Sequence, residues 1–139
     1  MNSDWGPTTD TNELAIRNLL ARIAHMADQG HLDEYVELFT VDASWELPDS
    51  SRRGRAEIRA GAEERRGSGL SGPGSFSRHV ITTVAVQLID NEKAVADSYF
   101  LFYRNTATSP TIFNMGHYHD DLRFDEGAWR IARRQITFG

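Results

Sequence analysis

A histidine at the start of a long apolar segment is the first candidate for chemistry in this sequence. His79 begins residues 79–86, whose β-branched side chains predict a β-strand. Histidine exchanges a proton readily near neutral pH, and it becomes a general base when a carboxylate holds one ring nitrogen. The alternative is a core histidine whose hydrogen bonds are satisfied without any catalytic use.

Asp28 is the candidate for that carboxylate. It lies in the last turn of the first predicted helix, close to the apolar stripe of that helix. The dipole at a helix C-terminus disfavours an acid, so a partner elsewhere in the chain would stabilise Asp28. The alternative is an aspartate exposed to water. We therefore predict an Asp28–His79 dyad in which the acid orients the base.

Three further polar residues are candidates for the same site or for a metal. His117 and His119 flank Tyr118 on a predicted strand, so the two histidines share one face with Asp121. Such a cluster could bind a metal, but a polar, solvated face is the simpler interpretation, and we predict no metal. Arg134 could stabilise negative charge on a leaving group or an enolate. Its alternative is a surface arginine.

Large apolar side chains could form the walls of a substrate pocket. In the last strand, alternation places Trp129 and Ile131 on one face, and the other face carries Arg130, Ala132, Arg134, Ile136 and Phe138. Ordinary core packing explains Trp45, Leu47, Phe100 and Phe102 equally well. The predicted substrate-binding residues are Trp45, Leu47, Phe100, Phe102, His117, His119, Ile136 and Phe138.

The elements that position these residues follow a simple order. Helical periodicity predicts helices from Thr11 or Asn12 to Asp28, over residues 32–39 and over residues 54–66, with a strand at 43–47 between the last two. Residues 67–75 hold four glycines and one proline and form either a lid or a disordered connection. Strands are predicted over 78–89, 94–105, 111–124 and 128–138.

This order indicates an α+β fold with one domain. Long antiparallel strands curl, so we expect a cone-shaped α+β barrel whose curved, mostly antiparallel sheet wraps around three N-terminal helices. The cone has an open mouth and a deep apolar pocket. Residues 1–11 are predicted to be a flexible tail, and residues 12–139 form the domain.

Composition restricts the classes of function. The net charge of −5 argues against nucleic acid and anionic membrane surfaces as partners. The absence of cysteine excludes thiolate catalysis and cysteine-bound metals. No apolar run reaches the ~20 residues of a membrane helix, and the N-terminus has no apolar signal core. We expect a cytoplasmic protein.

Residues 12–138 resemble the nuclear transport factor 2-like superfamily, in its SnoaL-like branch. Three stretches carry the resemblance: ADQGHLDEY at 27–35; GRAEI at 54–58 followed by RHV at 78–80; and GHYHDDL at 116–122 followed by GAWRI at 127–131. The branch includes scytalone dehydratase and hexachlorocyclohexane dehydrochlorinase. Their aspartate–histidine dyad matches Asp28 and His79, and the arginine in the last strand of the dehydrochlorinase matches Arg134.

The sequence also departs from these relatives. The lysine of the dehydrochlorinase falls at Ile23, and the two pocket tyrosines of the dehydratase fall at Ala27 and Leu47. The base of ketosteroid isomerase would also fall at Leu47, which argues against that chemistry. The dyad is therefore kept while the groups that polarise the substrate have changed, and this puts the substrate in question more than the proton transfer.

These observations predict a cofactor-independent lyase of the dehydratase or dehydrohalogenase type. His79 would take a carbon-bound proton from a small, apolar, cyclic substrate. The alternatives are an isomerase or polyketide cyclase with the same base, or a non-catalytic module like the small subunits of ring-hydroxylating dioxygenases. Because relatives associate through the open face of the sheet, we expect a homodimer or homotrimer.

Overall fold

Helices precede most of the sheet along the chain, as predicted. The computed structural model describes residues 9–139, with the side chains described from Thr11 onwards. Its elements are α1 (Thr9–Gln29), α2 (Leu32–Glu37), β1 (Phe39–Leu47), β2 (Ser50–Arg53), α3 (Gly54–Gly67), β3 (Ser77–Leu88), β4 (Lys93–Arg104), β5 (Thr111–Asp125) and β6 (Ala128–Phe138).

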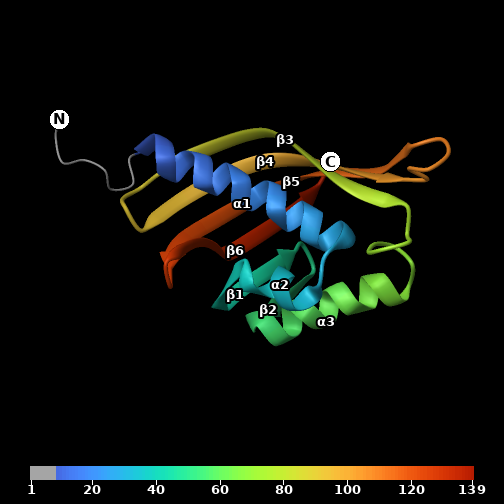
Figure 1. Ribbon diagram of the computed structural model, residues 1–139, viewed down its shortest axis with the longest axis horizontal. Helices are drawn as coiled ribbons and strands as arrows, with labels where there is room; N and C mark the ends of the chain where they lie inside the picture. Colours follow the sequence, from blue (N-terminus) through green and yellow to red (C-terminus); the bar gives the residue numbers. More distant parts are fainter. Residues whose placement is uncertain (1–8) are drawn as a thin grey trace.

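The six strands form one curved sheet in the order β2-β1-β6-β5-β4-β3. The pairing of β1 with β6 is parallel, and every other neighbouring pair is antiparallel. Figure 1 shows α1 along one face of the sheet beside β3, with α2 and α3 near β1 and β2. The predicted α+β class and the mostly antiparallel, curved sheet are confirmed.

Helix α1 forms because its apolar side chains recur on one face. Ile16, Leu19, Leu20 and Ile23 are each at most 5% exposed and pack against the sheet. The helix ends where the backbone N–H of Gly30 donates to the carbonyl of Met26. This ending places Asp28 in the last turn, against β3.

Several predicted boundaries differ from the structure. Helix α1 begins at Thr9, before the predicted start, and residues 1–8 of the predicted tail lie outside the described residues. Helix α2 ends at Glu37, because the parallel pairing with β6 takes Phe39 into β1. Strand β2 was not predicted, since Ser50–Arg53 is a polar edge strand without an apolar pattern.

The core divides into two clusters. The larger lies between α1 and the sheet, and the smaller contains Phe100, Phe102, Tyr118 and Ile136. Side chains from β1, from β3 and from the loop after α3 pack against the smaller cluster: Trp45, Leu47, Leu70 and Ile81.

Candidate active site

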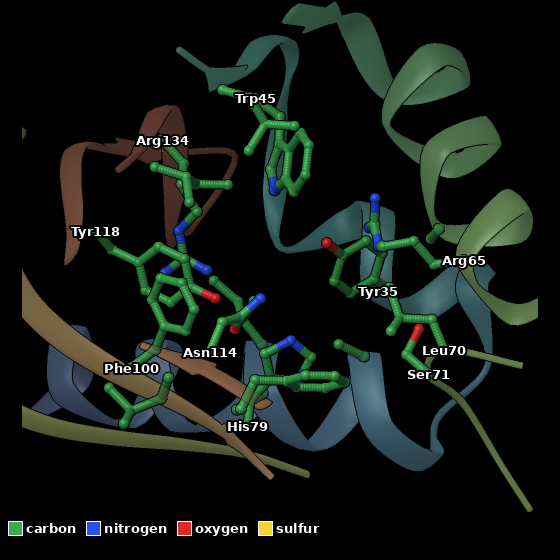
Figure 2. A pocket seen from close by; sticks show the side chains of 18 of the residues that line it. Tyr35, Trp45, Arg65, Leu70, Ser71, His79, Phe100, Asn114, Tyr118 and Arg134 are labelled. Atoms are coloured by element: carbon green, nitrogen blue, oxygen red, sulfur yellow. The ribbon is translucent and has the colours of Figure 1, made fainter. Parts of the chain in front are cut away.

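A cavity of about 140 Å³ opens beside the smaller cluster. Apolar and aromatic residues form most of its wall: Ile23, Ala24, Ala27, Trp45, Leu47, Ala62, Leu70, Ile81, Phe100, Phe102, Ile136 and Phe138. Its polar lining consists of Tyr35, Arg65, Arg66, Ser71, His79, Asn114, Tyr118 and Arg134. A few polar groups in an apolar hollow are typical of a small-molecule site. Figure 2 shows how most of these side chains surround it.

Asp28 and His79 meet at the wall of this cavity. Nδ1 of His79 lies 2.7 Å from Oδ1 of Asp28. The backbone N–H of His79 also donates to the carboxylate, at 3.1 Å from Oδ2. Asp28 is only 6% exposed, so these bonds satisfy a nearly buried acid. With an ionised carboxylate, Nδ1 carries the proton and Nε2 keeps a lone pair, which is the arrangement that a general base needs.

The ring of His79 has a second support. It packs against Phe102 with ring centroids 4.6 Å apart. His79 and Phe102 are register partners on β3 and β4, so neighbouring strands fix both rings. The imidazole is therefore held by one acid and one aromatic ring.

Arg134 lines the cavity but is already paired. Its Nε and Nη2 donate to the two carboxylate oxygens of Asp120, at 2.8 and 3.0 Å. Both side chains are buried, with Arg134 4% and Asp120 0% exposed. The guanidinium also lies over the ring of Tyr118, 3.8 Å from its centroid. The ion pair raises the pKa of Arg134 although burial lowers it, so the residue stays charged.

The predicted faces of the last strand were wrong. Ile131 pairs with Leu122 and Arg133 pairs with Asp121, which leaves Ala132 as an extra residue in β6. This β-bulge resets the alternation, so Ile131 and Arg134 point to the same side of the sheet. Arg134, Ile136 and Phe138 consequently line the cavity, while Trp129 and Ile131 belong to the larger core cluster.

Most of the predicted pocket walls are in place. The apolar residues of that prediction all line the cavity: Trp45, Leu47, Phe100, Phe102, Ile136 and Phe138. They come from β1, β4 and β6, which are not all neighbours in the sheet, so the cavity depends on the curvature that brings these strands around one hollow.

His117 and His119 do not line the cavity, so this expectation needs correction. Gly116, Tyr118 and Asp120 are buried on the inner face of β5, and strand alternation therefore turns both histidines to the outer face. There Nε2 of His117 and Nδ1 of His119 each lie 2.8 Å from the same oxygen of Asp97. This contact lowers the pKa of the Asp97 carboxyl.

Several polar residues of the cavity were missed from the sequence. Tyr118 is buried, which raises its pKa to about 12 and keeps its hydroxyl protonated at neutral pH. Tyr118 lies four positions before Leu122, so the two share one face of the strand, and the apolar Leu122 could have indicated that Tyr118 faces inward. Asn114 has a buried Oδ1 without a hydrogen-bond partner in the described chain. Nothing in the sequence marks Asn114, because a bulge at Phe113 sets its direction.

Arg66 fixes the helix end that carries Asp28. Its Nη2 donates to the carbonyl groups of Met26, Ala27 and Gly30 at the C-terminus of α1. The last carbonyls of a helix have few or no partners within it, so a partly buried cation that donates to them stabilises this end of α1. The loop after α3 packs over this arginine, and a Cβ at Gly72 would lie 2.6 Å from its Cγ. The loop thus forms part of the cavity wall, through Leu70 and Ser71.

Neither a metal-binding cluster nor a membrane-spanning helix occurs in the described part of the chain. Among the residues that the structure describes, no group of three histidine, aspartate or glutamate side chains is arranged to hold a metal ion. None of the described helices is long and apolar enough to cross a membrane.

Several solved structures share this fold. A Nostoc punctiforme protein of unknown function with a cystatin-like fold has 20% identity and a TM-score of 0.82, over 96% of both chains. A single-residue variant of Rv3472, a protein of unknown function from Mycobacterium tuberculosis, has 26% identity and a TM-score of 0.78, over 91% of this chain and 76% of that one. A Novosphingobium aromaticivorans structure, provisionally described as a scytalone dehydratase, has 22% identity and a TM-score of 0.75, over 95% and 89%.

No curated protein matches the chain. The sequence profile of the SnoaL-like domain, however, matches residues 10–135, which is most of its length. The chain therefore belongs to the SnoaL-like domain family, within the nuclear transport factor 2-like superfamily.

Proposed function

We propose that the protein is a cofactor-independent lyase that acts on a small, cyclic, largely apolar molecule. The observation that carries the proposal is the 2.7 Å contact between Nδ1 of His79 and Oδ1 of Asp28 at the wall of an apolar cavity. A non-catalytic module would not need a buried acid that orients an imidazole toward a hollow. A cavity of about 150 Å³ can hold a benzene ring, so the cavity of about 140 Å³ suits a substrate with one ring.

The proposed reaction begins with proton transfer. Nε2 of His79 takes a proton from a carbon next to the leaving group, and Asp28 stabilises the imidazolium that forms. The electrons of the C–H bond become the new double bond, and the leaving group departs with the electrons of its own bond. A hydroxide takes the proton back from the imidazolium and leaves as water, whereas a halide leaves as the anion and the imidazolium then releases its proton to solvent.

Two groups are candidates to face the leaving atom. Tyr118 keeps its hydroxyl proton because burial raises its pKa to about 12, so it can donate a hydrogen bond. Arg134 has used Nε and Nη2 on Asp120, which leaves Nη1 for the substrate. The buried, unpartnered Oδ1 of Asn114 could accept a hydrogen bond from a substrate hydroxyl.

The test compares matched histidine variants. The wild type is incubated with a panel of cyclic β-hydroxyketones and halogenated cyclohexanes, and new double bonds are followed by ultraviolet absorption. His79→Gln should lose about 10²–10⁴-fold in turnover. His25→Gln, a histidine on α1 outside the cavity lining, serves as the control and should keep full activity. Full turnover in His79→Gln on a substrate of the wild type would disprove the mechanism.

An isomerase or polyketide cyclase with the same base is the second candidate. One observation favours it: Asp120 already neutralises Arg134, so the site offers no unpaired cation on the sheet side, among the described residues, for a departing anion. An isomerase needs only the base and a donor for an enolate oxygen. Product analysis separates the two, because elimination releases water or halide and isomerisation conserves the atoms of the substrate.

A further inference from the structure

The charged groups around the cavity are paired, with one exception. His79 is bonded to Asp28, Arg134 to Asp120, and Arg66 to backbone carbonyls. Among residues 9–139, the guanidinium of Arg65 has neither an ion pair nor a hydrogen bond, although Arg65 lines the cavity and is partly buried. Arg65 is therefore the cation of the described cavity lining whose N–H donors have no acceptor.

The position of Arg65 follows from the face of α3 on which it lies. Ile58 and Ala62 are buried side chains of that helix, at 2% and 5% exposure. Arg65 comes three residues after Ala62, so helical spacing places it on the same inward face. The C-terminal dipole of α3 favours a cation there, which allows a charge on a face that otherwise packs inward.

The guanidinium is aimed by an aromatic ring and not by an acid. Its central carbon lies 4.7 Å from the ring centroid of Trp45, a cation–π contact that leaves the N–H donors free. Figure 2 shows Arg65 reaching from α3 toward the cavity, with Trp45 and Tyr35 nearby and His79 on the sheet side. The buried Tyr35 likewise has no hydrogen bond for its hydroxyl within the described chain.

We propose that Arg65 binds a carboxylate carried by the substrate, so that the protein acts on a small cyclic carboxylic acid. The fork of a guanidinium matches the two oxygens of a carboxylate and favours it over a neutral amide. The acid group would lie toward α3 while the ring rests among Phe100, Phe102 and Ile136, next to His79. This inference rests on the proposed function in that it takes the bound acid to be a substrate. Binding of the acid at Arg65 can be tested without turnover.

The test measures binding of benzoate and benzamide, which have the same shape and differ in charge. Titration calorimetry on the full chain should show benzoate binding about 10- to 100-fold more tightly than benzamide, as expected for charge-assisted hydrogen bonds. Arg65→Gln should abolish this preference while the affinity for benzamide stays the same. Arg59→Gln is the control, because Arg59 lies on the same helix but pairs with Asp33 and Glu63 outside the cavity.

Two further variants separate the possible explanations. Arg65→Lys keeps the charge without the fork and should retain part of the preference, and its thermal melting shows whether the fold is intact. His25→Gln, on α1 outside the cavity lining, should keep the full preference for benzoate. The readout is binding and needs no turnover, so a failed lyase mechanism would leave this result unchanged. Equal affinity of the wild type for the two probes, or a preference that survives in Arg65→Gln, would overturn the proposal.

Discussion

Removal of the acid that pairs with Arg134 should destabilise the protein strongly. Asp120 and Arg134 are 0% and 4% exposed and share two hydrogen bonds of 2.8 and 3.0 Å. Asp120→Asn keeps the size of the side chain but removes its charge. It also turns one acceptor into an N–H donor that faces a guanidinium donor. The variant thus leaves a buried cation without a counter-charge.

The expected loss follows from that geometry. Breaking a buried ion pair by removing one partner costs about 3–5 kcal/mol, because the remaining charge stays desolvated. Unfolding entropy is about 2.1 cal/mol/K per residue, so for 139 residues the melting temperature should fall by roughly 10–17 °C. Total stability of a domain is about 5–15 kcal/mol, so the variant should fold but lie near the limit.

Urea denaturation and thermal melting followed by circular dichroism measure this loss. Asp121→Asn is the matched control, because Asp121 is the next residue of β5 and faces the other side of the sheet; it should change stability by less than about 0.5 kcal/mol. The double variant Asp120→Asn/Arg134→Met removes both charges and should be more stable than Asp120→Asn alone. A loss below about 1 kcal/mol in Asp120→Asn, or a double variant no more stable than the single one, would refute the reasoning.

Three other predictions concern the same sheet. Burial raises the pKa of Tyr118 from 10.0 to about 12. The unfolded chain therefore loses this proton first, and stability present below pH 10 should fall by about 3 kcal/mol as the pH rises toward 12. Tyr118→Phe should remove that part of the slope in alkaline urea titrations, and unchanged slopes would contradict the prediction. Gly116→Ala places a Cβ 2.3 Å from a carbonyl of β6 and should cost at least about 2 kcal/mol in urea denaturation. Gly67→Ala meets nothing within 4 Å and is its neutral control. Alanine at both His117 and His119 should leave benzoate affinity unchanged in calorimetry, because both lie on the outer face; a weaker affinity would place them at the cavity.

Much of the architecture was predictable because the strands are long and apolar. The predicted strand at 128–138 agrees with β6, and those at 78–89, 94–105 and 111–124 agree within one residue with β3, β4 and β5. Strand β2 could not be predicted, because its four residues are polar and its pairing with β1 depends on tertiary structure. Local periodicity reports burial, so an exposed edge strand gives no signal.

The candidate site was predictable only in part, because the residues that meet there lie far apart in the sequence. The contact between Asp28 and His79 spans 51 positions, and no local pattern encodes it. The prediction came instead from the chemistry of the two residues and from a resemblance. Arg134 was assigned a free charge because its partner, Asp120, lies on another strand. Sequence alternation gave the correct spacing for His117 and His119 but could not say which face is inward.

The wrong facing predicted for the last strand has a structural cause that recurs in the sheet. Strand β3 has an extra residue between Thr82 and Ala85, β5 has one at Phe113, and β6 has one at Ala132. Each bulge shifts the alternation by one residue, so a strict period of two fails beyond it. A bulge also bends its strand, and it depends on strand pairing that no single segment reveals.

Two of these bulges lie between the packed core and the cavity. In β3, Val86 packs under α1 on one side of the bulge, and Ile81 lines the cavity on the other. In β6, Ile131 belongs to the core and Ile136 to the cavity wall, on either side of Ala132. Since bulges increase the bend of a strand, the sheet turns where α1 ends. Beyond this turn the sheet lies over the cavity and no longer over α1. The turn therefore keeps open the space that His79 faces.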